Sequence, residues 1–107
     1  MVKRKEFVYV CSKFKGKTFV ERNRNVEFAR QRAVEIYAKG YIPICVHIYL
    51  EQATDLNETN GDRKELLELG KEFIRLCHQV WVFGEVSEGM KGEIQYAKKL
   101  KKEIKWI

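Results

Sequence analysis

The sequence predicts an α/β protein, a three-layer sandwich around a parallel sheet of four to five strands, of the flavodoxin-like or Rossmann-like kind. Short apolar runs rich in β-branched and aromatic residues alternate along the chain with longer segments of helical periodicity. These runs are too apolar for strands with one solvated face, which favours a parallel sheet covered on both sides. Since no repeat, linker or low-complexity stretch interrupts the alternation, residues 1–107 are expected to form a single domain.

The first half of the chain supplies two strands and a helix. Residues 7–11 form a short buried strand. Asn23 or Asn25 is expected to cap the helix that follows, whose apolar residues recur at helical spacing until Gly40 stops it. The second strand is expected over residues 42–48, with its proline confined to the start because proline donates no hydrogen bond to a neighbouring strand.

The second half repeats the alternation after a polar loop. Its expected elements are a loop over 51–61, a helix around 66–77, a strand over 79–84, a helix over 90–100 entered through Ser87–Gly89, and a last strand over 104–107. The predicted order is therefore β-α-β-α-β-α-β, with right-handed crossovers.

Charge is unevenly distributed. The formal net charge is +6, from 21 basic and 15 acidic residues, with bases concentrated in residues 1–24 and 98–107 and acids in excess between them. The basic ends suggest an anionic partner, whereas the acidic middle argues against a general nucleic-acid-binding coat. A phosphate-bearing small molecule fits this pattern, and a nucleic-acid binder is retained only as a third hypothesis. No apolar run is long enough to span a membrane, so no membrane partner is expected.

The three cysteines indicate a reducing compartment. Cys11, Cys45 and Cys77 are odd in number, form no CxxC pair and lie in apolar runs, which predicts small buried hydrophobes instead of disulfides or zinc ligands. We therefore expect a cytoplasmic protein. No cluster of potential ligands has metal-binding spacing, so no metal is expected.

The predicted fold indicates where a ligand would bind. In an open parallel sheet, ligands bind beyond the carboxyl ends of the strands, where the strand order switches direction. That rule selects three segments as candidate site walls: Ser12–Gly16, His47–Glu51 and Gly84–Glu93.

The segment Gly84–Glu93 carries the most chemistry. Ser87 can cap the following helix, and free backbone amides near Gly89 make an anion site that suits a phosphate. Glu93 lies about one turn into this helix, where we expect the helix dipole to lower its pKa and keep it ionised. An ionised, positioned carboxylate is what a glycosidic nucleophile requires. By spacing alone this signal is weak, and an ordinary capped helix with a surface glutamate is the favoured explanation of the pattern.

The pattern Ser87-x-Gly89-x-x-x-Glu93 after an apolar strand resembles the signature of the nucleoside 2-deoxyribosyltransferase-like superfamily, which includes the 2′-deoxynucleoside 5′-monophosphate N-glycosidases. The first strand with Ser12 and Gly16, the second strand with His47, and Trp81–Gly84 are similar to a small branch of that superfamily. The resemblance covers nearly the whole chain.

The resemblance implies roles for individual residues. Glu93 matches the nucleophile that attacks the anomeric carbon, and Ser87 matches the serine that binds the 5′-phosphate where the transferases have aspartate. Tyr9 and Ser12 match positions that line the sugar and base pocket. Gly16 matches a small residue that lets the loop pass close to the ligand.

The chain also departs from the family pattern, with His78 where aspartate is frequent, Lys13 where proline is frequent and, most important, no second carboxylate at the matching position. The second carboxylate, which protonates the leaving base, maps near Gly70; Glu68 and Glu72 flank this position, and His47 or Glu88 could substitute. The sequence thus predicts an N-glycosidase or deoxyribosyltransferase that acts on a deoxynucleotide without a cofactor. The alternative is a non-catalytic module that binds a nucleotide-derived ligand. Because the superfamily completes its sites across subunits, a homodimer or larger assembly is expected.

Overall fold

The computed structural model describes residues 5–14, 16–46, 48–49 and 63–107. The loop predicted over 51–61 lies outside these residues. The elements are β1 (Phe7–Cys11), α1 (Phe19–Ala38), β2 (Ile42–Ile44), α3 (Arg63–Leu76), β3 (Gln79–Val82), α4 (Glu88–Lys99) and β4 (Glu103–Trp106). Their order and the parallel pairing of the strands confirm the predicted α/β class.

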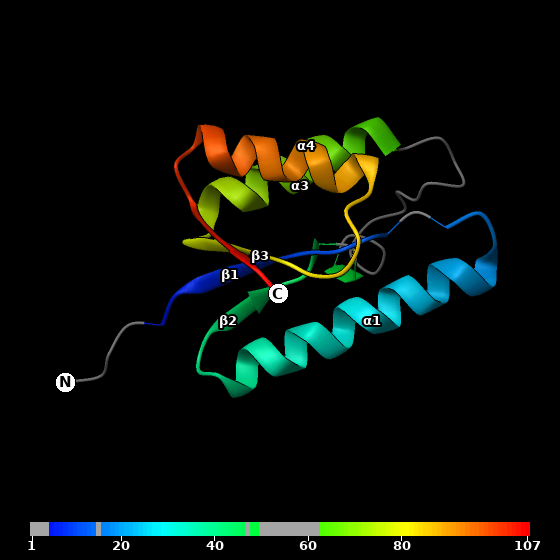
Figure 1. Ribbon diagram of the computed structural model, residues 1–107, viewed down its shortest axis with the longest axis horizontal. Coiled ribbons are helices and arrows are strands. Elements are labelled where there is room, and N and C mark those ends of the chain that lie inside the picture. The colour runs from blue at the N-terminus through cyan, green and yellow to red at the C-terminus, as the bar shows by residue number, and fades with distance from the viewer. Residues whose placement is uncertain (1–4, 15, 47, 50–62) are drawn as a thin grey trace.

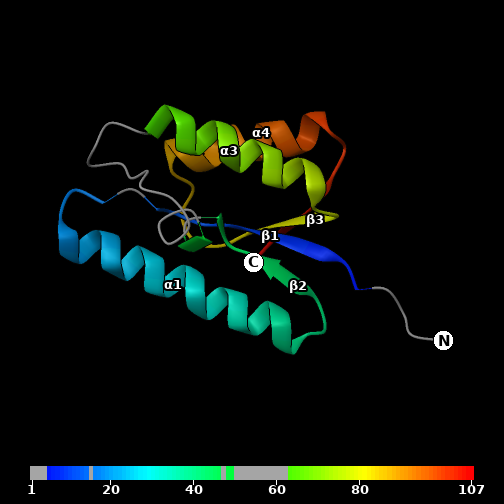
Figure 2. The same ribbon diagram turned by 180° about the vertical axis from the view of Figure 1, so that it is seen from behind.

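The sheet is the middle of three layers. Figures 1 and 2 show α1 on one face of the sheet and α3 with α4 on the other. Side chains of β1 alternate between the two faces, as a buried parallel strand requires. Val8 and Val10 join the core cluster on the α1 side, whereas Tyr9 and Cys11 join the cluster beneath α3 and α4.

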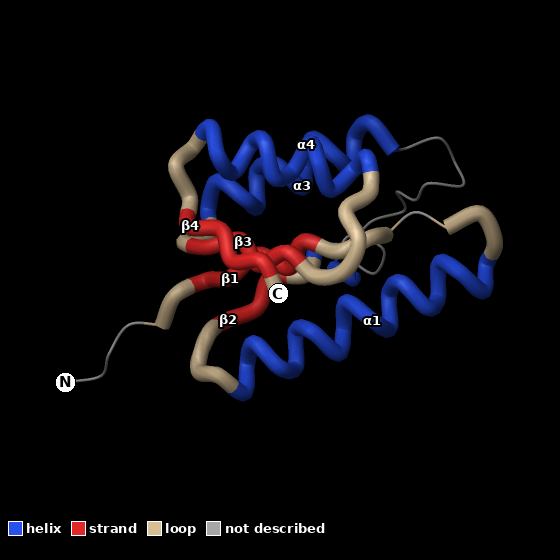
Figure 3. The backbone as a smooth tube through the Cα atoms, in the orientation of Figure 1, coloured by secondary structure: helices blue, strands red, loops and turns tan. Residues whose placement is uncertain are grey.

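The strand order creates a switch point between β1 and β3. The sheet has the order β2-β1-β3-β4, so the chain leaves β1 towards one edge and later returns to β1's other side. Figure 3 shows the tubes of these central strands between the two helical layers. Loops that follow neighbouring strands on either side of a switch diverge and leave a crevice at the carboxyl ends. The segments after β1 and β3 therefore flank such a crevice at the same end of the sheet.

Helix α1 begins earlier than the sequence predicts. Its N-cap is Thr18, whose Oγ1 accepts a hydrogen bond from Glu21 N at 3.1 Å. The Glu21 carboxylate accepts in turn from the Lys17 amide at 2.7 Å, so the first turn is stabilised from both sides. The predicted caps were wrong, because Asn23 lies inside the helix and Asn25 donates from Nδ2 to Phe14 O at 3.2 Å.

Two strands are shorter than predicted. β2 ends at Ile44, and its Pro43, placed at the strand start by prediction, is the middle residue of three. Proline is tolerated there because β2 lies at an edge of the described sheet and pairs only with β1. β3 ends at Val82, and Gly84 then adopts a φ of 76°, a left-handed conformation that favours glycine. This turn directs the chain back towards α4.

The three cysteines are free thiols, as predicted, with Cys11 and Cys77 buried and Cys45 half-buried. Burial raises the pKa of the Cys77 thiol to about 11, and burial with the nearby Glu93 carboxyl raises that of Cys11 further. Both thiols are therefore protonated and unreactive at neutral pH. No helix among the described residues is both long enough and apolar enough to cross a bilayer.

Candidate active site

The start of α4 is fixed by a reciprocal cap. The Ser87 hydroxyl accepts from the Met90 amide, and the Met90 sulfur accepts from the Ser87 amide, each at 3.4 Å. Met90 is itself buried in the core, so the cap attaches the first turn of α4 to the sheet. This fixed turn places Gly89 and Glu93 on the side of α4 that faces α3.

Glu93 lies in the second turn of α4 and is only 5% exposed. Its Oε2 accepts a short hydrogen bond from the hydroxyl of Tyr9, which is fully buried on β1. The two residues are 84 positions apart in the chain. A buried carboxyl group with one specific donor is held in a defined orientation, which a surface glutamate is not.

Burial controls the ionisation of this pair. Removal from water raises the pKa of Glu93 to about 7, and the hydrogen bond from Tyr9 opposes this rise. The sequence-based expectation that the helix dipole lowers this pKa was wrong, because desolvation of a buried carboxylate outweighs the field of a helix end. The pKa of Tyr9 is raised well above its ordinary value, first by burial and then by Glu93, so Tyr9 keeps its proton and remains a donor.

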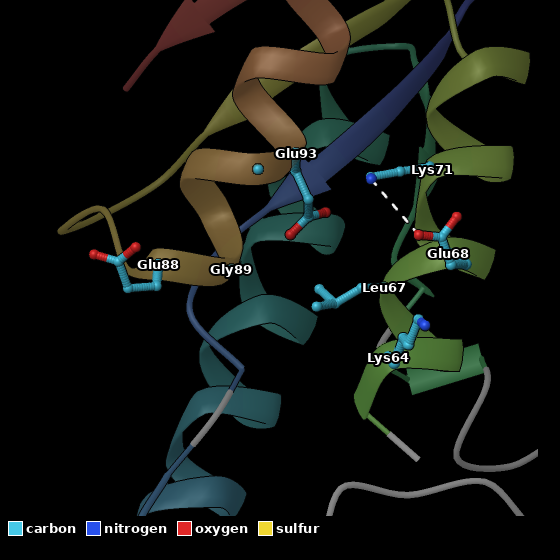
Figure 4. Close-up of a pocket in the computed structure, with 8 residues that line it drawn as sticks. Lys64, Leu67, Glu68, Lys71, Glu88, Gly89 and Glu93 are labelled. Carbon is cyan, nitrogen blue, oxygen red and sulfur yellow. Dashed lines mark ion pairs between the residues drawn. The ribbon is translucent and has the colours of Figure 1, made fainter. Parts of the chain in front are cut away.

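A pocket of about 200 Å³ opens beside Glu93, between α3 and α4. The α4 wall consists of Glu88, Gly89, Gly92 and Glu93, and the α3 wall consists of Lys64, Leu67, Glu68 and Lys71. In Figure 4 the Glu93 carboxylate points into the space between the helices, and Leu67 and Lys71 reach towards it from α3. The pocket therefore has a carboxylate on one wall and cations on the other.

The α3 wall was missed by the sequence analysis, which took its site walls from the segments directly after strands and considered Glu68 only as a neighbour of Gly70. Its lining residues lie at positions i, i+3, i+4 and i+7, so they share one face of the helix. A mixed apolar and charged face at this spacing, on the helix that precedes β3, is the signal that could have identified the wall.

The charges in the pocket are only partly compensated. Lys71 forms an ion pair with Glu68 at 3.7 Å. Glu88 pairs with Lys91 at 3.1 Å and points away from the pocket, with its side chain 85% exposed. Lys64 forms no ion pair with any residue that the structure describes. On the α3 wall, opposite the N-terminus of α4, there is therefore a cation with no counterion among the described residues.

The other predicted site residues are distributed around this centre. Gly89 lines the pocket, and Ser87 caps the helix that carries Gly89. Ser12 follows β1, is only 1% exposed, and its hydroxyl has no hydrogen-bond partner within the described residues. His47 lies outside the described residues.

Gly16 lies against the first turn of α1, where a side chain would clash with the helix backbone. A Cβ at this position would approach the Arg22 amide nitrogen to 2.7 Å and Glu21 Cβ to 2.8 Å. Gly16 therefore allows the loop after β1 to pass against the first turn of α1. It is absent from the residues that line the pocket.

Within the described ranges, no group of three or more histidine, cysteine, aspartate or glutamate side chains could hold a metal ion. Among the described residues, the groups available to chemistry at the pocket are the Glu93 carboxyl, the Tyr9 hydroxyl that bonds it, and the charged side chains of α3.

The model of a protein family described as a domain of unknown function (DUF7768) matches residues 6–107. The chain belongs to this family. A search of the curated proteins finds no match to this DUF7768 chain.

Among solved structures, the DUF7768 chain is similar to a protein described as a 2-desoxiribosyltransferase from Leishmania mexicana. The TM-score is 0.60 at 14% sequence identity, and the match covers 95% of this chain. It covers 63% of the other chain, so the present chain spans less than two thirds of that protein's length. The comparison establishes a deoxyribosyltransferase-like fold, in agreement with the α/β fold that the sequence predicts.

Proposed function

We propose that this chain cleaves or transfers the N-glycosidic bond of a deoxynucleoside 5′-monophosphate, with Glu93 as the nucleophile. One observation carries the proposal: a buried carboxyl that opens on a pocket and is oriented by a tyrosine hydroxyl. A structural glutamate gains nothing from such burial, because removal from water disfavours its charged form. Groups with perturbed pKa values in clefts are candidates for functional sites.

The proposed reaction proceeds in two displacements. The ionised Glu93 Oε attacks the anomeric carbon while the C–N bond breaks and its electron pair passes to the base nitrogen. The base leaves as it takes a proton. Water or a second base then attacks the anomeric carbon and releases the Glu93 carboxylate. Tyr9 orients one oxygen of the nucleophile, which leaves the other oxygen available to attack.

A phosphate on the substrate suits the charges of this pocket. The N-terminus of α4 presents the backbone near Gly89, and Ser87 is the capping residue. Lys64 faces this end from α3 without a counterion among the described residues. A serine at position 87 does not repel a phosphate as an aspartate would.

The leaving base needs a proton from a donor in the pocket. Gly70, where the resemblance places a second carboxylate, is buried on α3 and brings no proton donor. Glu68 and Lys71 line the pocket and can supply that proton, whereas Glu88 points away. The absence of a carboxylate at position 70 favours the second candidate function, a module that binds a nucleotide without turning it over.

The deciding experiment is incubation with each of the four deoxynucleoside 5′-monophosphates, with free base detected by chromatography. Base released by the wild type and lost in Glu93→Gln supports the enzyme. The matched control is Glu27→Gln, the same chemical change on the opposite layer, where the side chain is 54% exposed. If no base appears but a nucleotide raises the melting temperature, the binding module replaces the enzyme.

We further propose that the site is completed by a second copy of the chain. Ligand pockets usually measure about 300–1,000 Å³, whereas the pocket here measures about 200 Å³ and is walled, as far as the described residues go, by two helices. Light scattering at micromolar concentration tests this proposal, and a monomer that releases base would contradict it.

A further inference from the structure

Gly70 lies where α3 passes closest to the hydroxyl of Tyr9. A Cβ built on Gly70 would be 3.3 Å from Tyr9 Oη, which is the one atom outside the local helix that it would meet within 4 Å among the described residues. That distance is tighter than an ordinary van der Waals contact, so a side chain at this position would press on the hydroxyl. Glycine inside a 14-residue helix is unfavourable unless something requires the space, and the hydroxyl is what occupies it.

Tyr9 cannot easily give way to such a side chain. It is 1% exposed and belongs to the core cluster formed with Ile74, Val80 and Met90. Its ring is held by side chains of α3, β3 and α4, and its hydroxyl reaches Glu93 on the far side. Three elements therefore meet at one oxygen atom: α3 through Gly70, β1 through Tyr9 itself, and α4 through Glu93.

We propose that Gly70 is a positioning residue for Glu93 that acts through the hydroxyl of Tyr9. Because it has no side chain, α3 can lie against the hydroxyl without displacing it, and the hydrogen bond to Glu93 keeps its length and direction. The consequence for catalysis rests on the proposed function, whereas the effect of Gly70 on the positions of Tyr9 and Glu93 is independent of that function.

Several other charged or titratable groups surround Glu93. Cys11 lies near it on β1, and Lys64, Glu68 and Lys71 face the pocket from α3, whereas the side chain of Glu88 at the start of α4 points away from the pocket. Among the described residues, Tyr9 is the group that donates a hydrogen bond to the Glu93 carboxyl. This hydrogen bond lowers the pKa of Glu93 against the effect of burial. A displaced hydroxyl therefore leaves a carboxyl group that is harder to ionise.

The experiment is an NMR pH titration of the Glu93 side-chain carboxyl carbon in the ligand-free protein. It compares the wild type, Gly70→Ala, Tyr9→Phe and the double variant. We expect Gly70→Ala to raise the pKa of Glu93 above its wild-type value of about 7. Tyr9→Phe should raise it too. In the Tyr9→Phe background the hydroxyl is gone, so Gly70→Ala should add no further shift.

Asn23→Ala is the control for helix propensity. Asn23 lies inside α1 with an exposed side chain, so alanine there favours the helix on the layer opposite to Glu93. The pKa of Glu93 should stay unchanged in this variant. An equal pKa in the wild type and Gly70→Ala, or an equal shift in both backgrounds, overturns the proposal.

Folding provides a second measurement of the same coupling. If Gly70→Ala alone does not fold, the double variant with Tyr9→Phe should fold again, because the oxygen that the new methyl group meets has been removed. Failure of the double variant to recover while Tyr9→Phe alone folds would overturn the proposal.

The titration needs no substrate, so it separates this inference from the proposed function. If the pKa values respond as expected but no base is released, only the proposed function fails. If base is released but the pKa of Glu93 is indifferent to Gly70→Ala, only this inference fails. In an active enzyme, Gly70→Ala should reduce kcat about 3- to 10-fold below pH 7, in keeping with a weakened hydrogen bond. The reduction should diminish as alkaline pH restores the ionised nucleophile.

Discussion

Replacement of Glu93 by glutamine should make the protein more stable above neutral pH. The pKa of Glu93 is about 7 in the folded protein and 4.5 in its ordinary environment. Between these values the unfolded chain releases a proton that the folded protein still holds, so the stability of the wild type falls as pH rises through this window. Glutamine carries no charge and can still accept the hydrogen bond from Tyr9.

The magnitude follows from the difference of about 2.5 between the two pKa values. Each pKa unit corresponds to about 1.4 kcal/mol, so ionisation of Glu93 destabilises the folded wild type by roughly 3 kcal/mol. Solvent screens the Glu93 carboxyl little because the side chain is buried. A loss of this size is a large fraction of the stability of a small domain.

Urea unfolding from about pH 4 to about pH 8 measures this effect. The stability advantage of Glu93→Gln over the wild type should be near zero at the acidic end, grow between the two pKa values, and level off above about 7. Glu27→Gln on the exposed face of α1 should follow the wild type. Parallel curves for the wild type and Glu93→Gln would refute the reasoning, because the carboxyl would then be ionised in both states.

Three further predictions concern the fold. Thr18→Ala should destabilise the protein by about 1 kcal/mol through loss of the α1 cap, whereas Asn23→Ala should change little; equal effects in thermal unfolding would contradict this capping assignment. Ile74→Ala should cost roughly 2–5 kcal/mol in urea unfolding, because its side chain is fully buried under α3; a cost below that of a surface substitution would contradict this packing. Cys11 and Cys77 should resist alkylation until the protein unfolds, as mass spectrometry can test, and rapid modification of the native protein would contradict their burial.

The site was only partly predictable from the sequence, because one of its two walls carries a local sequence motif and the other does not. The α4 wall follows β3 within a few residues, so Ser87, Gly89 and Glu93 could be identified from a local motif. The α3 wall has no such motif. Lys64 and Lys71 resemble the solvated charges of any amphipathic helix until the structure places them opposite Glu93.

The same distinction explains the error about the ionisation of Glu93. A helix dipole can be inferred from sequence position alone, whereas desolvation depends on what covers the side chain. Here the cover includes Tyr9, which comes from β1, 84 residues away. The misplaced cap of α1 has a related cause, because several capping residues precede the first apolar turn and tertiary contacts select among them. Asn25 bonds to the loop at Phe14, and Thr18 is left to cap the helix.

The sequence by itself determined the alternation of strands and helices, the parallel sheet and the capped helix that carries Glu93. These features depend on periodicity and capping, which act over a few neighbouring residues. Only the tertiary structure decided that Glu93 is buried, that it bonds to Tyr9, and that Gly70 leaves room for the hydroxyl between them. Those features depend on contacts between residues far apart in the chain, and a pattern read along the chain contains no distance between its segments.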